Sequence, residues 1–272
     1  MIESNLNKGI CRGYGMCYTY VRTHYRMKGW EVKRMNITRD EAFRAVCEFR
    51  TPIGNSQYSV GTGMFVNAPI GRGQYRGWIV TASHVALKTN RLTKIIFATE
   101  NGRGIALPLT SFGPLETWRH HKIADVSAFP IKFTEENLPY MNNRFIPSDH
   151  INFSHVPVSR DYELTSIGFP HGLGINGSFS PFTFRSYASS GFVTLNRFDV
   201  NIPCEFFCLE NPSVGGYSGC PVFALGYTMD GNERKIYNRS ICHGIMHGTL
   251  CDDTGGKIAM VTPAFYMKDV LI

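Results

Sequence analysis

Three side chains with the chemistry for nucleophilic catalysis stand far apart in the sequence: His84, Asp125 and Ser218. A serine hydroxyl is a poor nucleophile at neutral pH unless a base removes its proton as it attacks, and histidine is the commonest base. A carboxylate can orient the imidazole and stabilise its protonated form. If the fold brings these three residues together, they could cleave an acyl bond.

The serine lies in a glycine-rich stretch, Asn211–Phe223, which reads Asn-Pro-Ser-Val-Gly-Gly-Tyr-Ser-Gly-Cys-Pro-Val-Phe. Residues without a Cβ suit a tight turn in which the backbone approaches a ligand closely. Such a turn can direct successive N–H groups at one point, as stabilisation of an oxyanion requires. A plain glycine-rich hairpin turn is the alternative for this stretch taken alone.

The histidine and the aspartate each allow a simpler explanation as well. His84 stands in Thr81-Ala-Ser-His-Val85, at the end of a strand that we predict over 76–81, and a lone histidine there could be a satisfied core residue. Asp125 is embedded in an apolar segment, 123–131, where a carboxylate is costly to bury unless a hydrogen-bond partner compensates it. A solvent-facing position on an edge strand is the alternative for Asp125.

The composition is that of a globular chain. Of 272 residues, 43% are apolar and 18% are charged, and no stretch approaches the ~20 apolar residues needed to span a bilayer. The N-terminus is polar and lacks the apolar run of a secretory signal, so we expect a cytoplasmic protein without a membrane partner. The eight cysteines are then expected to be buried thiols, and we expect no metal and no cofactor. A zinc site at Cys204-x3-Cys208 is the alternative.

The positive charge is concentrated at one end. The net charge is +7, and residues 1–36 carry seven basic and two acidic side chains, which leaves +5 for this segment and +2 for the rest. We predict a basic N-terminal extension over 1–36. Aromatic residues interleaved with basic ones can bind single-stranded nucleic acid, but we favour a solvated extension and expect no nucleic-acid partner.

The elements that must position the three side chains are mostly short strands. Segments 46–49, 61–66, 76–81, 94–98, 163–168, 184–196, 204–210, 236–248 and 256–261 read as strands separated by turns, which predicts an all-β barrel or sandwich. Thr38 and Glu41 form a capping box for a short helix near 39–44. Thr262 and Pro263 predict the start of a second helix that runs to Ile272.

The sequence motifs around the three residues resemble those of trypsin-like serine peptidases. Thr81-Ala-Ser-His-Val85 is similar to their Thr-Ala-Ala-His, Ala124-Asp-Val-Ser-Ala-Phe129 to Asp-Ile-Ala-Leu, and Gly216-Tyr-Ser-Gly-Cys-Pro221 to Gly-Asp-Ser-Gly-Gly-Pro. Within this family the sequence most resembles the HtrA/Deg branch. Four further motifs are similar to motifs of that branch: Gly61-Thr-Gly-Met-Phe-Val66, Ile167-Gly-Phe-Pro-His-Gly-Leu-Gly174, Ser190-Gly-Phe-Val193 and Gly244-Ile245. The resemblance covers residues 46–272.

The resemblance implies an all-β fold of two perpendicular six-stranded chymotrypsin-like barrels, with the site in the cleft between them. We place the N-terminal barrel at 37–145 and the C-terminal barrel with its terminal helix at 146–272. The sequence departs from the family where Tyr217 and Cys220 replace an acid and a glycine, and where no PDZ module follows. Activation by a freed N-terminus that pairs with that acid is therefore not expected.

By resemblance, Ser218 is the nucleophile, His84 the general base and Asp125 its orienting acid, with an oxyanion hole formed by the amides of Gly216 and Ser218. We therefore expect a serine endopeptidase that acts on a protein or peptide through an acyl-enzyme. A catalytically inactive binding module on the same barrels is the alternative, with its basic N-terminal segment on nucleic acid. The sequence gives no oligomeric state.

The resemblance also places two segments around the primary substrate pocket. They comprise Asn211, Pro212, Ser213 and Val214, and Met246, His247, Gly248 and Thr249. Pro212 falls at the pocket base, where no acid stands, so we expect a medium-sized apolar substrate side chain and not Lys or Arg. A pocket histidine that selects glutamine, as in viral 3C-like peptidases, is the alternative for His247.

Overall fold

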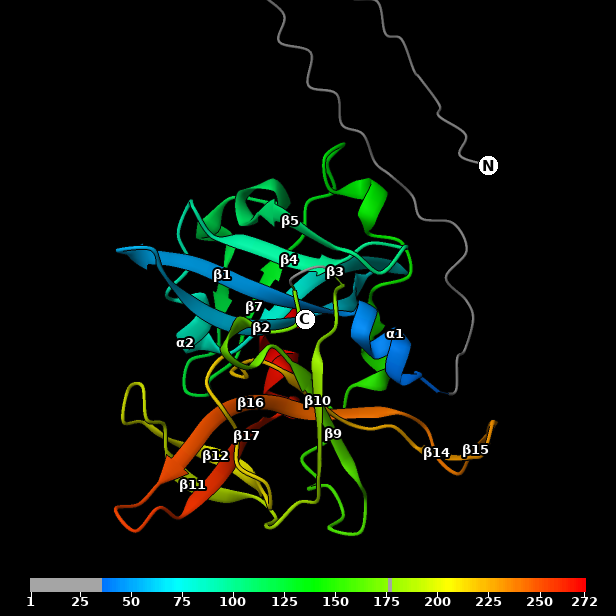
Figure 1. Cartoon of the computed structure of the whole chain (residues 1–272), viewed down its shortest axis with the longest axis vertical. Helices are drawn as coiled ribbons and strands as arrows, with labels where there is room; N and C mark the ends of the chain where they lie inside the picture. The colour runs from blue at the N-terminus through cyan, green and yellow to red at the C-terminus, as the bar shows by residue number, and fades with distance from the viewer. Residues whose placement is uncertain (1–35, 176–177) are drawn as a thin grey trace, which may run out of the picture. The chain divides into compact units, whose positions relative to one another are not determined.

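A computed structural model describes residues 36–175 and 178–272, all of which belong to one compact unit, Arg34–Ile272. Apart from Asn36, the basic extension predicted over 1–36 lies outside the described residues. Two β-sheets dominate this unit, and Figure 1 shows the first in blue to green and the second in green to red.

The first sheet has eight strands in the order β5-β4-β1-β2-β3-β7-β6, with β8 paired to β2. All of its pairs are antiparallel except β2 with β8, which is parallel. The strands are β1 (Val46–Gly54), β2 (Gln57–Gly71), β3 (Gln74–Thr81), β4 (Lys94–Ala98), β5 (Gly104–Pro108), β6 (Arg119–His120), β7 (Ser127–Pro130) and β8 (Ile146–Pro147).

The second sheet has seven strands in the order β10-β9-β13-β16-β17-β12-β11, and a separate hairpin pairs β14 with β15. The strands are β9 (Leu164–Gly168), β10 (Phe182–Ser186), β11 (Val193–Asn196), β12 (Pro203–Leu209), β13 (Pro221–Ala224), β14 (Tyr227–Asp230), β15 (Glu233–Ile236), β16 (Ile241–Cys251) and β17 (Lys257–Pro263). The strand counts exceed the expected six and six, partly because the two-residue strands β6 and β8 extend the first sheet.

Helices are short and few, as the sequence predicts. They are α1 (Arg39–Arg44), α2 (Ser83–Ala86) and α3 (Lys268–Leu271), with 3-10 turns η1 (Leu109–Phe112), η2 (Leu115–Thr117), η3 (Leu138–Tyr140), η4 (Ser148–His150), η5 (Pro170–Gly172) and η6 (Ala264–Met267). The predicted capping box of α1 is confirmed, because Thr38 and Glu41 satisfy each other's backbone N–H groups.

The predicted start of the C-terminal helix is wrong. Thr262 and Pro263 end strand β17, and the helical turns begin only at Ala264. Thr262 pairs with Ile245 across the sheet, so pairing with β16 keeps the backbone extended where the local sequence favours a helix cap. Tertiary pairing here overrides a local capping preference.

One apolar cluster contains residues from both sheets. It includes Met64 and Val80 of the first sheet and Phe206 and Phe223 of the second, all fully buried. The C-terminal turns join it through Leu271, and α3 contacts β7 of the first sheet. The two sheets thus share part of their core, which fixes the surfaces that face each other. Strand β8 lies just after the predicted boundary at residue 145 and still pairs with β2 of the first sheet. The division of the chain into two halves at that residue stays a prediction.

Small residues let β2 pack closely on its neighbours. A Cβ at Gly61 would lie 2.5 Å from a methyl group of Val85 in α2, and a Cβ at Gly63 would lie 2.5 Å from the ring of Phe49. The two glycines of the Gly61-Thr-Gly63 motif are therefore required for packing, because they let α2 and the ring of Phe49 lie close to β2. No helix in the described part of the chain has both the length and the apolar character needed to cross a membrane.

Candidate active site

Strand register brings His84 and Asp125 together. Strands β3 and β7 are antiparallel neighbours, with Thr81 opposite Ser127. His84 follows the end of β3 in the single turn α2, and Asp125 precedes the start of β7 by two residues. Both side chains therefore emerge at the same end of the first sheet. The His84 Nδ1 to Asp125 Oδ2 distance is 2.7 Å, and the backbone N–H of His84 donates to Oδ1 at 3.0 Å.

Asp125 is fully buried and accepts further hydrogen bonds from the second sheet. His247 Nδ1 lies 2.6 Å from Oδ2, and Arg197 Nη2 lies 3.4 Å from Oδ1. Burial alone would raise the pKa of Asp125, but the hydrogen bonds from His247 and His84 outweigh it and hold that pKa well below its usual range. Asp125 is therefore a carboxylate at neutral pH, as an orienting group for a base must be.

The turn that carries Ser218 is held by Thr62 of β2. The Thr62 N–H donates to the carbonyl of Ser218 at 2.8 Å, and its hydroxyl donates to the carbonyl of Gly216 at 2.9 Å. The same hydroxyl accepts from the N–H of Phe169 at 3.1 Å. The carbonyl of Thr62 in turn accepts a hydrogen bond from the hydroxyl of Thr81 at 2.6 Å. A single buried threonine of the first sheet thus fixes the serine turn of the second.

The amides of Gly216 and Ser218 are free to bind an anion. Neither N–H donates to another group among the residues that the structure describes. The carbonyl of Gly215 accepts from the N–H of His171 at 2.7 Å. Because the N–H and C=O of one peptide point in opposite directions, this bond directs the Gly216 N–H away from His171. Gly216 has φ +89°, and a Cβ there would lie 2.4 Å from the carbonyl of Phe169, so only glycine fits.

The Ser218 hydroxyl donates to the backbone carbonyl of His247 at 3.3 Å. Within the described residues it makes no hydrogen bond to His84, whose own Nε2 has no partner there. The structure therefore joins His84 to Asp125 and leaves the hydroxyl on a neighbouring carbonyl. Catalytic hydrogen bonds are often long or unformed before substrate binds.

The two segments predicted to line the pocket lie against each other. The Thr249 hydroxyl donates to the carbonyl of Ser213 at 3.0 Å. Asn211, Pro212 and Val214 are exposed and Gly248 and Thr249 partly exposed, whereas Ser213, Met246 and His247 are buried. A role of these residues in substrate selection stays a prediction.

The two residues at which the sequence departs from the family motifs, Tyr217 and Cys220, both lie in the core. Tyr217 is fully buried, stacks on Phe184 and donates its hydroxyl to the carbonyl of Phe182 at 2.7 Å. Cys220 is also fully buried, and burial raises the pKa of its thiol well above the usual value. Neither side chain is placed to act as a nucleophile or an acid at neutral pH.

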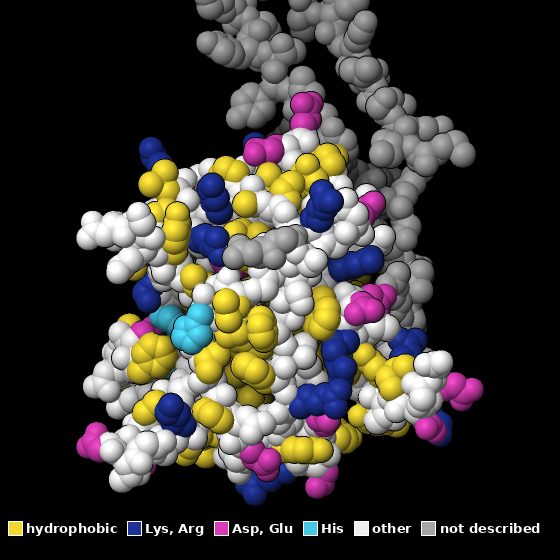
Figure 2. Space-filling model, in the orientation of Figure 1, with side chains coloured by type: hydrophobic (Ala, Val, Ile, Leu, Met, Phe, Trp, Pro, Cys, Tyr) yellow, Lys and Arg dark blue, Asp and Glu magenta, His cyan; other side chains and the backbone are white. Residues whose placement is uncertain are grey.

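Sequence reasoning missed the position of three residues around the His84–Asp125 pair. His247 was expected in the substrate pocket, but its imidazole contacts Asp125. Arg197 and Phe198, in the turn after β11, had no signal at all: Arg197 contacts Asp125, and the 60% exposed ring of Phe198 packs against His84 and His247 with centroids 5.1 and 4.2 Å apart. On the face drawn in Figure 2, histidine side chains reach the surface at the height where α2 lies in Figure 1.

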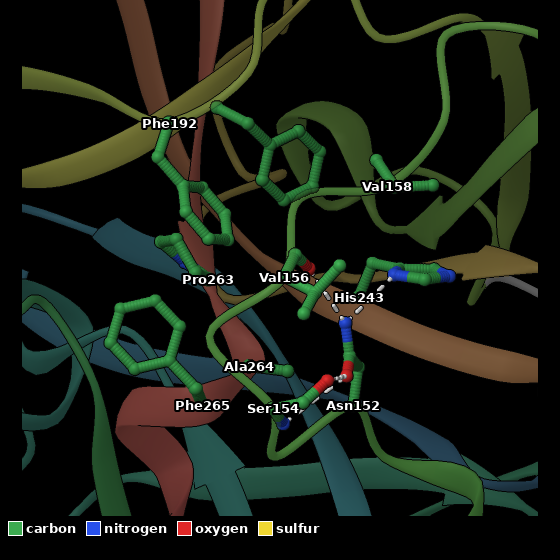
Figure 3. A pocket seen from close by; sticks show the side chains of 10 residues that line it. Asn152, Ser154, Val156, Val158, Phe192, His243, Pro263, Ala264 and Phe265 are labelled. Atoms are coloured by element: carbon green, nitrogen blue, oxygen red, sulfur yellow. Dashed lines mark hydrogen bonds between the residues drawn. The ribbon is translucent and has the colours of Figure 1, made fainter.

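The hollow drawn in Figure 3 is separate from this site. It is lined by the 152–158 segment together with residues of the second sheet and the C-terminal turn, among them His243, Pro263 and Phe265. Its polar residues include Asn152 and His243, which are 3.4 Å apart, and burial lowers the pKa of His243 to about 4. None of the predicted site residues lines it.

Comparison with solved structures identifies the fold as that of the chymotrypsin-like serine proteases. The mutant, inactive form of Rv3671c from M. tuberculosis matches with a TM-score of 0.50 and 15% identity, over 85% of this chain and 87% of that chain. A serine endoprotease from Yersinia pestis matches at TM-score 0.48 and 19% identity, over 87% and 66% of the two chains. Human heparin binding protein matches at TM-score 0.47 and 11% identity, over 86% and 92%.

No protein-family model matches the sequence, and no curated protein matches it either. The comparison therefore shows the fold alone, a chymotrypsin-like arrangement of two mostly antiparallel sheets. The activity of this particular chain has to be argued from its own residues.

Proposed function

We propose that this protein is a serine endopeptidase that hydrolyses peptide bonds through an acyl-enzyme. The observation that carries the proposal is the His84–Asp125 pair: a fully buried, ionised carboxylate accepts both the ring and the backbone N–H of one histidine. The Ser218 turn is linked to this pair through His247, whose carbonyl accepts the Ser218 hydroxyl and whose ring contacts Asp125. In support, the scaffold is one on which proteases are built.

The residues divide the reaction between them as follows. Ser218 Oγ attacks the carbonyl carbon of the scissile peptide while its proton passes to His84 Nε2. The developing oxyanion accepts hydrogen bonds from the N–H groups of Gly216 and Ser218. Protonated His84, stabilised by Asp125, then gives its proton to the leaving amine. Water repeats the sequence on the acyl-enzyme and releases the acid.

One rotation is required before the first step. The Ser218 hydroxyl, now on the carbonyl of His247, has to turn about its Cα–Cβ bond toward His84. Such a rotamer change in an accessible side chain is fast compared with enzymatic turnover. Within this reading, substrate binding selects the rotamer that faces the base.

A serine-reactive fluorophosphonate probe tests the proposal on the full chain. We expect covalent labelling of one residue, identified as Ser218 by peptide mass spectrometry. Ser218→Ala should abolish labelling, and His84→Ala should slow it by at least ~10³-fold, since the base would be absent. Ser159→Ala, at an exposed serine far along the chain, serves as the control and should label like the unchanged protein.

The second candidate is a protease-fold binding module without catalysis. The orientation of the Ser218 hydroxyl toward a carbonyl is the observation that favours it. It requires that Ser218 is no more reactive than Ser159. Absence of labelling in a folded, full-length sample would therefore favour this candidate and refute the first.

A further inference from the structure

Asp125 Oδ2 accepts hydrogen bonds from two imidazoles at once. His84 Nδ1 lies 2.7 Å from it and His247 Nδ1 lies 2.6 Å from it. The two rings approach edge to face, with centroids 5.7 Å apart and planes at 86°. His247 and Asp125 are fully buried, whereas the side chain of His84 is 10% exposed. Only one of the two imidazoles therefore reaches the surface.

The surroundings of His247 determine where its proton lies. Its Nε2 faces the backbone N–H of Phe198 at 3.4 Å, which can only be a donor. Nε2 must then be the acceptor, so the proton sits on Nδ1 and is donated to Asp125. The rings of Phe198 and Phe206 lie on the imidazole, with centroids 4.2 and 4.9 Å away. If Nε2 also carried a proton, its N–H and the backbone N–H of Phe198 would be two donors that face each other between these apolar rings.

His84 has no such restriction. In the described part of the chain nothing donates to its Nε2, so this nitrogen is free to take a proton. The charges around the pair are Asp125, Arg197 and Asp199, and Arg197 lies 3.4 Å from the first and 2.5 Å from the second. These three sum to one negative charge, which the protonation of His84 neutralises. A charged His247 would cancel that negative charge in advance.

His247 also contacts the nucleophile through its backbone. Its carbonyl accepts the hydroxyl of Ser218, and the carbonyl of the preceding Met246 accepts the N–H of Gly219 at 2.7 Å. One residue of β16 thus contacts the acid of the first sheet with its side chain and the serine of the second with its main chain.

We propose that His247 is a positioning residue, a hydrogen-bond donor through Nδ1 that fixes the Asp125 carboxylate for His84 and ties it to the Ser218 turn. The inference rests on the proposed peptidase function for its kinetic consequences, but not for the protonation state of His247. It assigns different tasks to two histidines on one carboxylate: His84 carries the proton of the reaction, and His247 holds the acceptor in place.

A metal ion is the rival explanation for this cluster. Ligand atoms of His84, Asp125 and His247 lie within 4.8 Å of one another. A metal on both Nδ1 atoms would move the His247 proton to Nε2, directly against the N–H of Phe198. The donor set is therefore matched to hydrogen bonds and not to a cation.

Two variants and one control separate positioning from simple structural support. His247→Asn keeps an N–H donor close to the place of Nδ1, and His247→Leu keeps the bulk but removes the donor. His243→Leu is the control, since it removes another largely buried imidazole from the same strand, on a side chain that the proposed machinery does not use. We expect His247→Leu to lower kcat more than tenfold with KM within threefold, and His247→Asn to retain kcat within about threefold.

The pH profile and NMR provide readouts that a merely structural role would not move. Without the donor, more of the Asp125 charge is available to protonated His84, so the acid limb of kcat/KM should move to higher pH in His247→Leu and stay in place in His247→Asn and His243→Leu. In the full-length unchanged protein, ¹⁵N spectra should show the Nδ1–H tautomer of His247.

Each result decides the matter. An unlabelled serine would refute the peptidase while the ¹⁵N spectra still test the protonation of His247. An Nε2–H tautomer of His247, or stoichiometric zinc in the purified protein, would overturn the inference. So would equal kinetics of His247→Leu and His243→Leu. If His247→Leu does not fold, the spectra and the retained activity of His247→Asn decide it.

Discussion

The two sheets position their parts of the candidate site in different ways. In the first sheet, His84 and Asp125 meet because β3 and β7 are neighbours in register, so their contact follows from strand pairing within one sheet. In the second, Ser218 sits in a loop whose conformation depends on contacts from outside, chiefly Thr62 of the first sheet. The His84–Asp125 pair is built onto one sheet, and the Ser218 turn is held by the packing of one sheet on the other.

This difference has a physical consequence. A hydrogen-bonded strand pair resists displacement, whereas a glycine-rich loop keeps its shape only while its few anchors remain. Changes in the first sheet should therefore remove chemistry without altering the loop. Changes at the anchors should reduce activity by moving the loop while the His84–Asp125 pair survives.

The largest expected effect is at the acid itself. Asp125→Asn should lower kcat by about 10⁴-fold, because an amide cannot hold His84 in the required tautomer or stabilise its protonated form. The variant and an Asp161→Asn control, at an exposed position, would be compared by steady-state cleavage of a peptide substrate. Wild-type turnover in Asp125→Asn would contradict the role of the first sheet.

Strain in the serine loop should come next. Gly216→Ala places a Cβ 2.4 Å from the carbonyl of Phe169 at φ +89°, so the loop has to move and its amide leaves the oxyanion position. We expect kcat to fall on the order of 10²–10³-fold, the usual value of one such donor. Gly231→Ala is matched in positive φ (+60°) but has open space, and should leave kcat unchanged. An active Gly216→Ala would disprove the assignment of this amide.

The link between the sheets is tested at Thr62. Thr62→Val removes the hydroxyl that donates to the Gly216 carbonyl and accepts from the buried N–H of Phe169, so both groups lose this partner. We expect a loss of about 1–3 kcal/mol in the free energy of unfolding and about a tenfold fall in kcat. Thr62→Ser retains the hydroxyl and should recover most of both losses. Denaturant unfolding and kinetics on the three proteins would show whether the loop depends on this anchor.

The smallest effect concerns the pH dependence of the first sheet. Burial, which outweighs the opposing charge of Arg50, raises the pKa of Glu48 to about 7. Because this is above the unfolded value, the folded state binds the proton more tightly, and stability is lost as the pH rises from about 4.5 through 7. Glu48→Gln keeps an acceptor for Arg50 but cannot ionise. We expect it to exceed the unchanged protein by about 1–3 kcal/mol at pH 8 and to equal it at pH 4.5.

Chemical unfolding at the two pH values measures this difference, with exposed Glu116→Gln as the control. A constant gap between the proteins across the range would show that the Glu48 carboxylate does not titrate there. A stability difference that grows with pH would show that Glu48 titrates in the folded protein. It would also place a pH-sensitive group of the first sheet next to Thr62, which is opposite Glu48 in the β1–β2 pair.

Much of the fold could be predicted from local patterns. The capping box of α1 depends on residues three apart, and the alternation of apolar side chains reports which face of a strand is buried. The same is true of Gly216 and Gly219 beside Ser218, whose positive φ values follow from the turn. Prediction failed at Thr262 and Pro263, where a helix start in the local sequence gave way to pairing with β16.

What the sequence by itself determined is the set of candidate site residues and the all-β class, because both depend on residue types and short-range spacing. Only the tertiary structure decided that Asp125 contacts a second imidazole and an arginine, 122 and 72 residues away, and that Thr62 anchors the serine turn. Such contacts arise from strand register and from the packing of two sheets. A pattern along the chain reports which face a residue occupies, but not which distant residue meets it there.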